Sequence, residues 1–176
     1  DRSKKILESY CKNTTISTKL IDCNTQGPGY ARNEGIKVAN GEFISFLDVD
    51  DEISPNKHSL LIEKFKKYPK AGMVIGNTMK EYSDGRRLSL NVGKLDELNS
   101  SPKIGLLWLK YLMLNPTTCS YLVRTEILNK NNIQFASINY GEDIAFNILV
   151  GINFDVIYTN QLVCTYHRHS QSALSN

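Results

Sequence analysis

Apolar side chains recur at helical spacing in three stretches of the N-terminal half of the chain. Residues 3–10, 30–39 and 55–68 each place apolar residues three or four positions apart, with polar or charged residues between them. This periodicity predicts amphipathic helices, because side chains at that spacing share one helix face. The dipeptide Asn40–Gly41 is suited to end the second helix.

Three shorter apolar runs alternate with these helices and predict strands. They occupy residues 18–23, 43–47 and 72–76. The run at 43–47 is compact and apolar, which is typical of a strand buried on both faces of a parallel sheet. Strands alternating with helices in this way predict a doubly wound, mostly parallel α/β sheet flanked by helices.

The regular alternation weakens after residue 79. Residues 80–90 predict a hairpin around Asp84–Gly85, and the polar stretch 91–101 predicts a loop. The remaining predicted elements are a strand at 120–123, helices at 125–131 and 142–150, and strands at 155–158 and 162–166. No repeat or linker divides the chain, so we expect one domain over residues 1–176.

Two segments leave a choice open. Residues 104–114 are almost wholly apolar around Lys110, which fits either a buried core helix or a helix in a membrane interface. The second segment is a group of lysines, Lys64, Lys66, Lys67 and Lys70. A solvated helix face and contact with an anionic membrane surface both account for it.

Composition narrows the setting of the protein. The 21 basic and 18 acidic residues give a net charge of +3, too mild to indicate a nucleic-acid partner. The four cysteines are unevenly spaced without a Cys-x-x-Cys pair, which favours free thiols in a reducing compartment. No apolar run approaches the roughly 18 residues of a membrane-spanning helix, and the polar start is unlike a signal peptide. We therefore expect a cytoplasmic protein.

An acidic run follows directly on the apolar run at 43–47. Asp48, Asp50 and Asp51 lie where the predicted strand ends, which is the edge at which open α/β sheets bind ligands. Crowded carboxylates repel one another unless a cation is present, and Mg²⁺ and Mn²⁺ prefer oxygen ligands. The alternative is that these acids stabilise the start of the helix at 55–68.

Three segments carry a resemblance to a known family. The run from Gly29 to Pro55, GYARNEGIKVANGEFISFLDVDDEISP, resembles the central signature of glycosyltransferase family two. The segment Tyr140-Gly141-Glu142-Asp143 resembles the Glu-Asp segment that opens a helix in that family. Residues 166–172 resemble its Tyr-Arg-x-His-x-x-Ser ending, with His167 in place of the usual Arg. The resemblance implies a GT-A-type fold that is N-terminally incomplete, because the usual first strand and Asp-Asp-Gly-Ser segment do not precede these motifs.

The resemblance also implies roles on the donor side of the site. Asp50 would bind a divalent cation, Mn²⁺ or Mg²⁺, that bridges the diphosphate of the donor. Asp48 would contact the ribose or the sugar, and Asp51 would support them. Arg32 would pair with the acidic run or with the donor phosphates. His169 would be a further metal ligand or would hydrogen-bond the diphosphate.

On the acceptor side, Asp143 would be the catalytic base. It would take the proton of the acceptor hydroxyl as the oxygen attacks the anomeric carbon, which gives inversion. The alternative is an acid that only stabilises the first helical turn. We expect residues 1–90 to hold the donor and metal, and residues 91–176 to hold the acceptor and base.

The implied protein is a metal-dependent inverting glycosyltransferase. Its partners would be a nucleoside-diphosphate sugar, taken as a UDP-sugar, and a glycan or glycolipid acceptor in cell-surface polysaccharide or glycolipid synthesis. Peripheral contact with the inner face of the membrane would accompany a glycolipid acceptor. The alternatives are a non-catalytic scaffolding module with the same fold and a nucleotidyltransferase, and the incomplete N-terminal unit predicts weak donor binding by this chain alone.

Overall fold

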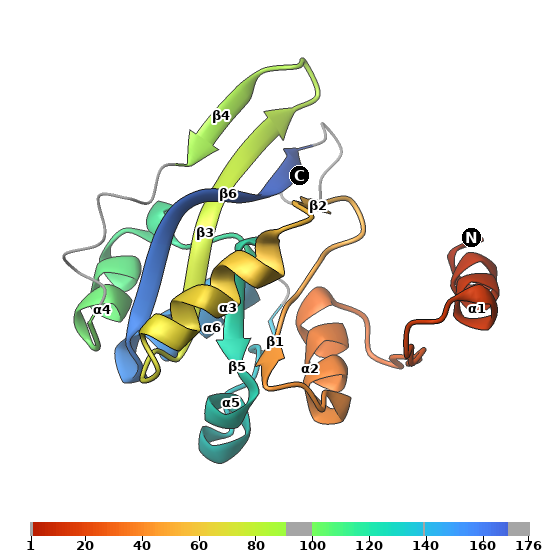
Figure 1. Cartoon of the computed structure of the whole chain (residues 1–176), viewed down its shortest axis with the longest axis horizontal. Helices are drawn as coiled ribbons and strands as arrows, with labels where there is room; N and C mark the ends of the chain where they lie inside the picture. Colours follow the sequence, from red (N-terminus) through yellow and green to blue (C-terminus); the bar gives the residue numbers. More distant parts are fainter. Residues whose placement is uncertain (1, 91–99, 139, 169–176) are drawn as a thin grey trace.

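The computed structural model describes residues 2–90, 100–138 and 140–168 as a curled sheet flanked by helices (Figure 1). The sheet follows the order β1-β5-β3-β6-β2, and β4 adds to β3 as a hairpin. Its strands are β1 (Phe43–Ile44), β2 (Glu52–Ile53), β3 (Met73–Tyr82), β4 (Arg87–Leu90), β5 (Tyr121–Arg124) and β6 (Val156–Arg168). The long strands β3 and β6 form its centre.

The direction of the strands corrects one part of the sequence prediction. Among the described residues, only β3 and β6 pair in parallel, and the other strand pairs are antiparallel. The crossover from β1 through a helix to β3 does return the chain in the same direction, as predicted. However, β5 lies between β1 and β3 and runs opposite to both. The sheet is therefore mixed and not mostly parallel.

Six α-helices are described, and all but the first of them lie around the sheet, on both of its faces (Figure 1). They are α1 (Ser3–Asn13), α2 (Pro28–Val38), α3 (Lys57–Lys67), α4 (Lys103–Lys110), α5 (Thr125–Asn131) and α6 (Glu142–Asn153). On one face, Leu61 and Phe65 of α3 pack on Val74 and Val163. On the other, α4 and α6 contribute Trp108 and Phe146 to a larger core.

Several predicted elements differ from those observed. Residues 18–23 form no strand, because a strand requires a hydrogen-bonded neighbour and none lies beside them in the described chain. The strand predicted at 43–47 is reduced to β1. The strands predicted at 155–158 and 162–166 are one strand, β6, with a register shift opposite Gly76. Most of the predicted loop 91–101 lies outside the described residues.

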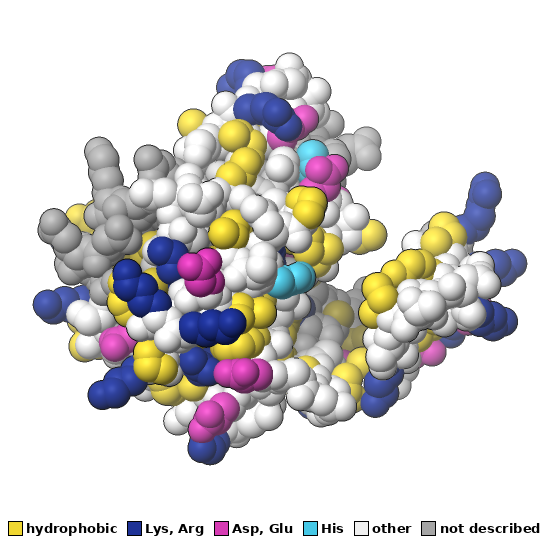
Figure 2. Space-filling model, in the orientation of Figure 1, with side chains coloured by type: hydrophobic (Ala, Val, Ile, Leu, Met, Phe, Trp, Pro, Cys, Tyr) yellow, Lys and Arg dark blue, Asp and Glu magenta, His cyan; other side chains and the backbone are white. Residues whose placement is uncertain are grey.

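Helix α1 stands apart from the rest of the molecule. None of its residues is buried, and its apolar side chains are exposed, Ile6 by 65%. Figure 2 shows this apolar face in yellow on the helix at the right. An ion pair of 3.1 Å between Lys4 Nζ and Asp22 Oδ2 ties α1 to the extended segment that follows it.

The helices α4 and α6 approach each other through two glycines. Gly105 of α4 lies against Gly151 and Ile152 of α6, and Trp108 covers Gly151. A Cβ atom added at Gly105 would lie 2.6 Å from the carbonyl carbon of Gly151. Two of the three atoms nearest to that Cβ, the backbone nitrogen of Ile152 and the carbonyl carbon of Gly151, are backbone atoms, which cannot move aside as a side chain can.

Replacing Gly105 by alanine is therefore expected to destabilise the protein. We expect Gly105→Ala to lower the free energy of unfolding by about 2 kcal/mol, as overpacking does in other cores. Gly35→Ala is the matched control, because Gly35 lies inside α2 with open space around it. The control should gain roughly 0.5 to 1 kcal/mol from better helix propensity. Urea denaturation measures both, and equal effects would contradict the close approach of α4 to α6.

Candidate functional site

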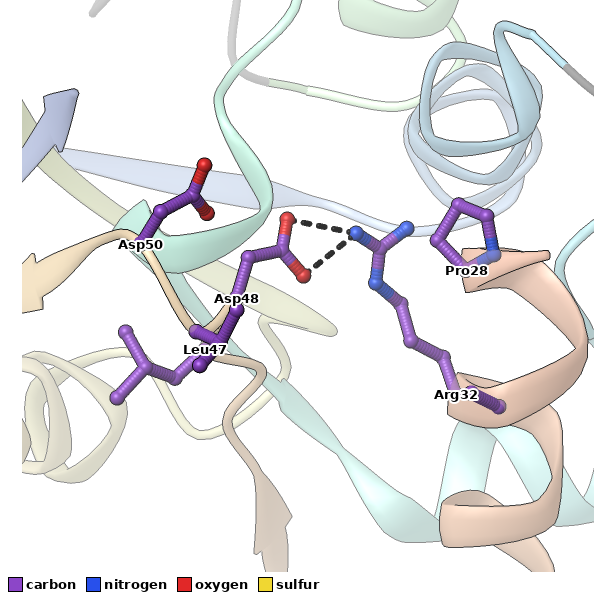
Figure 3. A pocket seen from close by; sticks show the side chains of 7 residues that line it. Pro28, Arg32, Leu47, Asp48 and Asp50 are labelled. Atoms are coloured by element: carbon purple, nitrogen blue, oxygen red, sulfur yellow. Dashed lines mark hydrogen bonds and ion pairs between the residues drawn. The ribbon is translucent and has the colours of Figure 1, made fainter. Parts of the chain in front are cut away.

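A pocket of about 440 Å³ opens between the start of α2 and the loop that follows β1 (Figure 3). The residues that line it are Pro28, Ala31, Arg32, Leu47, Asp48, Val49 and Asp50. The pocket therefore lies at the end of a strand that leads into the acidic run, which is where the sequence places the donor.

The acidic run forms a turn that separates its three carboxylates. The backbone N–H of Asp51 donates to the carbonyl of Asp48 at 3.1 Å. Asp48 points toward Arg32, whereas the exposed Asp50 makes no hydrogen bond or ion pair with a described residue (Figure 3). Asp51 is half-buried and accepts a 3.2 Å hydrogen bond from the backbone N–H of His167. Burial, and then the charges of Asp48 and Asp50, raise the pKa of Asp51.

Arg32 joins the acidic run to the start of α6. One guanidinium nitrogen lies 2.8 Å from both carboxylate oxygens of Asp48, and another lies 2.8 Å from Oε1 of Glu142. The side chains of Arg32 and Glu142 are only 11% and 8% exposed. Burial alone lowers the pKa of Arg32, but Asp48 and then Glu142 outweigh it and leave that pKa above its ordinary value. The contact also places the arginine 5.3 Å from the ring of Phe135.

Asp143 lies next to Glu142 in the first turn of α6. Gly141 directly precedes α6. Its φ of 78° is a left-handed conformation that suits glycine, and it turns the chain into the helix. Oδ1 of Asp143 accepts the backbone N–H of Ile144 at 2.8 Å. Burial raises the pKa of Tyr166, and the charges of Asp51, Asp50 and Asp143 raise it further.

The predicted metal site rests on these acids. Among residues 2–90, 100–138 and 140–168, no three His, Cys, Asp or Glu side chains are grouped to hold an ion. His169, predicted as a further ligand, lies outside the described residues. Mg²⁺ is commonly bound by one or two carboxylates together with substrate phosphates. Asp50, whose carboxylate is unpaired within the described chain, fits that mode, with Asp48 beside it.

Behind the acidic run lies a buried cation that the sequence analysis does not identify. Lys57 is fully buried and donates to Oγ of Ser45 at 2.7 Å, and burial lowers its pKa. The thiols of Cys119 and Cys164 lie 3.7 and 4.0 Å from the hydroxyl of Thr117. The sequence does carry one indication that Lys57 is buried. It shares a helix face with the apolar Leu61 and Phe65, at intervals of four residues.

Comparison with solved structures defines the fold. The crystal structure of Staphylococcus aureus TarS 1-349 in complex with UDP-GlcNAc matches with a TM-score of 0.71 at 20% identity. The match covers 100% of this chain and 49% of that chain. The complex of the same fragment with UDP gives a TM-score of 0.68 at 21% identity, over 97% of this chain and 48% of that one. The fold is thus the GT-A glycosyltransferase fold, as predicted.

The chain belongs to glycosyl transferase family 2, whose model matches residues 1–131. Poly-beta-1,6-N-acetyl-D-glucosamine synthase of Staphylococcus epidermidis is 38% identical over 77 residues, or 44% of this chain and 18% of that protein. The uncharacterized glycosyltransferase EpsJ of Bacillus subtilis is 28% identical over 84% of this chain and 43% of its own length. The chain therefore spans less than half the length of these relatives.

The bridge through Arg32 is open to a direct stability test. Arg32→Met should lower the free energy of unfolding by about 3 kcal/mol, because it leaves the buried Glu142 carboxylate without a partner. Adding Glu142→Gln to that variant removes the unpaired charge and should recover part of the loss. A double-mutant cycle by urea denaturation, with Glu142→Gln as the other single variant, gives the coupling energy. A coupling below about 0.5 kcal/mol, the usual value for sites that do not interact, would contradict the bridge.

Proposed function

We propose that the natural protein containing this chain is a metal-dependent inverting glycosyltransferase. It transfers a sugar from a UDP-sugar to a hydroxyl group of a glycan or glycolipid, in cell-surface polysaccharide or glycolipid synthesis. The observation that carries the proposal is the Arg32 bridge, which holds Asp48 at the pocket and Glu142 beside Asp143. Donor-side and acceptor-side carboxylates thus meet at one place.

The relatives support the chemical class of the substrates. The names of two of them specify N-acetylglucosamine transfer or polymer synthesis, and the TarS structures contain UDP or UDP-GlcNAc. The pocket adjoins the start of α2, where backbone N–H groups of a first helical turn favour a phosphate. A UDP-sugar donor and a polysaccharide or glycolipid product are consistent with both.

Each acid has a distinct role in the proposed reaction. Asp48, fixed by Arg32, orients the sugar or ribose of the donor. Asp50 and Asp48 would hold Mg²⁺ or Mn²⁺. The bound cation would neutralise the charge that develops on the leaving diphosphate. Asp143 accepts the proton of the acceptor hydroxyl while its oxygen forms a bond to the anomeric carbon, and the bond from that carbon to the diphosphate breaks. Displacement from the opposite face inverts the anomeric centre.

The setting proposed for this reaction is the cytoplasm, at the inner face of the membrane. Nucleotide sugars and membrane-linked acceptors would both be within reach there. In the described part of the chain, no helix has the length and apolarity to cross a bilayer. Attachment to the membrane through this domain would therefore be peripheral.

Loss of the base should slow turnover without affecting the fold. In the natural gene product, Asp143→Asn keeps an oxygen that can accept the N–H of Ile144 but cannot take a proton. Turnover at saturating UDP-sugar and acceptor should fall roughly 10²- to 10⁴-fold, with donor affinity little changed. Release of UDP measures turnover, and a thermal melt checks the fold. Asp22→Asn, an exposed acid paired with Lys4, is the control and should be as active as the parent. Turnover of Asp143→Asn near that of the control would assign the proton transfer to another group.

Metal dependence is expected to act through Asp50. Excess chelator should abolish UDP release, and Mn²⁺ or Mg²⁺ should restore it, because the diphosphate leaves with its charge neutralised. Asp50→Asn should raise the Mn²⁺ concentration needed for half-maximal turnover by at least tenfold, since a carboxylate ligand is lost. The measurement is a Mn²⁺ titration of turnover for both proteins. Undiminished activity in chelator would exclude the metal.

A further inference from the structure

Helix α4 is apolar on two faces, and among the described residues only one of these faces packs against another element. Ile104, Gly105 and Trp108 are buried where α4 packs on α6. The solvent side of α4 and the 3-10 turn Leu112–Leu114 that follows it are also apolar. This exposed group, called here the α4 surface, consists of Leu106, Leu109, Tyr111, Leu112, Met113 and Leu114, with exposed fractions between 41% and 91%.

Two lysines of α4 lie beside the α4 surface. Lys103, Leu106 and Lys110 follow one another at intervals of three and four, so both lysines flank the exposed leucine on one helix face. Neither lysine forms an ion pair with a described residue, and the ammonium of Lys110 lies 5.1 Å from the ring centroid of Tyr111. The sequence has no Asp or Glu from residue 100 to residue 125. The exposed apolar groups therefore lie beside two lysines, and the acid nearby in the described chain, Asp155, accepts a hydrogen bond from the backbone N–H of Ser101 just before α4.

We propose that the α4 surface docks on an anionic lipid bilayer. The leucines and Met113 enter the boundary between headgroups and acyl chains, and Lys103 and Lys110 contact lipid phosphates. This combination of an apolar face with lysines beside it is the pattern of helices that lie in a membrane interface. The helix has eight residues and lies in the plane of the interface, since it is too short to cross.

A bilayer fits this surface better than a protein partner does. The apolar side chains lie on a helix and the turn after it, at the side of the molecule opposite α1 (Figure 1). Leucine and methionine side chains with freely exposed tips suit a fluid environment, whereas a protein partner would have to offer a matching groove. An acidic groove on a partner protein would pair with the lysines. However, its charged groups would lose their hydration where they contact the apolar side chains of the α4 surface.

Docking on this surface would also orient the candidate site. The start of α4 packs on the last turn of α6 at Gly151, and the chain then returns along α6, where Asn147 donates to the carbonyl of Pro116 at 3.0 Å. The 3-10 turn thus lies toward the end of α6 that carries Asp143. This consequence rests on the proposed function and favours an acceptor linked to a membrane lipid. Docking itself does not depend on the reaction.

Vesicle flotation tests the proposal with the full chain of 176 residues. The protein should float with vesicles of equal parts phosphatidylglycerol and phosphatidylcholine, and far less with phosphatidylcholine alone. Raised salt should weaken the binding, because the lysine contribution is electrostatic. The readout is bound protein and uses no donor, acceptor or metal, so it is independent of whether the chain transfers sugar.

Two double variants separate the apolar and the basic contributions. Leu109→Gln with Met113→Gln should weaken binding at least tenfold, as expected from the loss of two buried apolar side chains. Lys103→Gln with Lys110→Gln should weaken it about 25-fold, at roughly fivefold for each lysine near an anionic surface. The matched controls are Leu88→Gln with Leu162→Gln, and Lys66→Gln with Lys67→Gln. All four control residues are exposed and lie outside the α4 surface.

Only variants whose melting temperature equals that of the parent are compared, so that a loss of binding cannot come from unfolding. Retained binding in the controls with loss in both test variants supports the proposal. Failure of the parent to float with the anionic vesicles overturns it, as does equal loss in test and control variants. Sedimentation velocity tests whether a second copy of the chain binds the α4 surface instead of a bilayer. A dimer that Leu109→Gln with Met113→Gln dissociates, together with absent vesicle binding, would make the α4 surface a self-association interface.

Discussion

The ion pairs of Arg32 are the interaction on which the arrangement of the site depends. Arg32 belongs to α2, Asp48 follows β1, and Glu142 begins α6, so one guanidinium holds three separate parts of the chain together. The approach of α2 to α6 is close, because a Cβ atom at Gly29 would lie 3.1 Å from Cγ of Glu142. Glu142 is too buried to stay charged at low cost without the arginine. Two neutral hydrogen bonds assist this bridge over a similar sequence separation, because the side-chain amide of Asn33 donates to the carbonyl of Phe135 and accepts its backbone N–H.

The same bridge sets the charge that a ligand would meet. Arg32 is matched by Asp48 and Glu142, and within the described chain the carboxylates of Asp50, Asp51 and Asp143 form no ion pair. A diphosphate entering this region would be repelled by Asp50 at the rim of the pocket. A divalent cation between the two reverses the sign of that interaction, which is a physical reason for the proposed metal that does not rely on the family. The raised pKa of Asp51 reflects the same crowding, after burial.

How far the sequence predicts the structure depends on the range of the interactions involved. Helices α3, α5 and α6 and the hairpin of β3 and β4 follow from periodicity and turn residues, which act over a few positions. The insertion of β5 between β1 and β3 does not, because it depends on pairing between distant segments. The same holds at the site, where the acidic run and Asp143 are recognisable as motifs. The dual pairing of Arg32 and the hydrogen bond from Lys57 to Ser45 arise only when the elements pack, and Ser45 has no local feature that predicts its partner.

Helix α6 gives the molecule a rigid connection between its two functional regions. Its first turn carries Glu142 and Asp143. Its last turn meets α4 where Gly151 lies against Gly105, and neither residue has a side chain to separate the two helices. A helix of 12 residues is about 18 Å long and bends little, so the position of α4 fixes the direction of the first turn. Because the contact is made by backbone atoms, it cannot slide as a contact between long side chains can. Any force that orients α4 therefore orients the first turn of α6 as well, although the contact at Gly151 lies in the last turn of that helix.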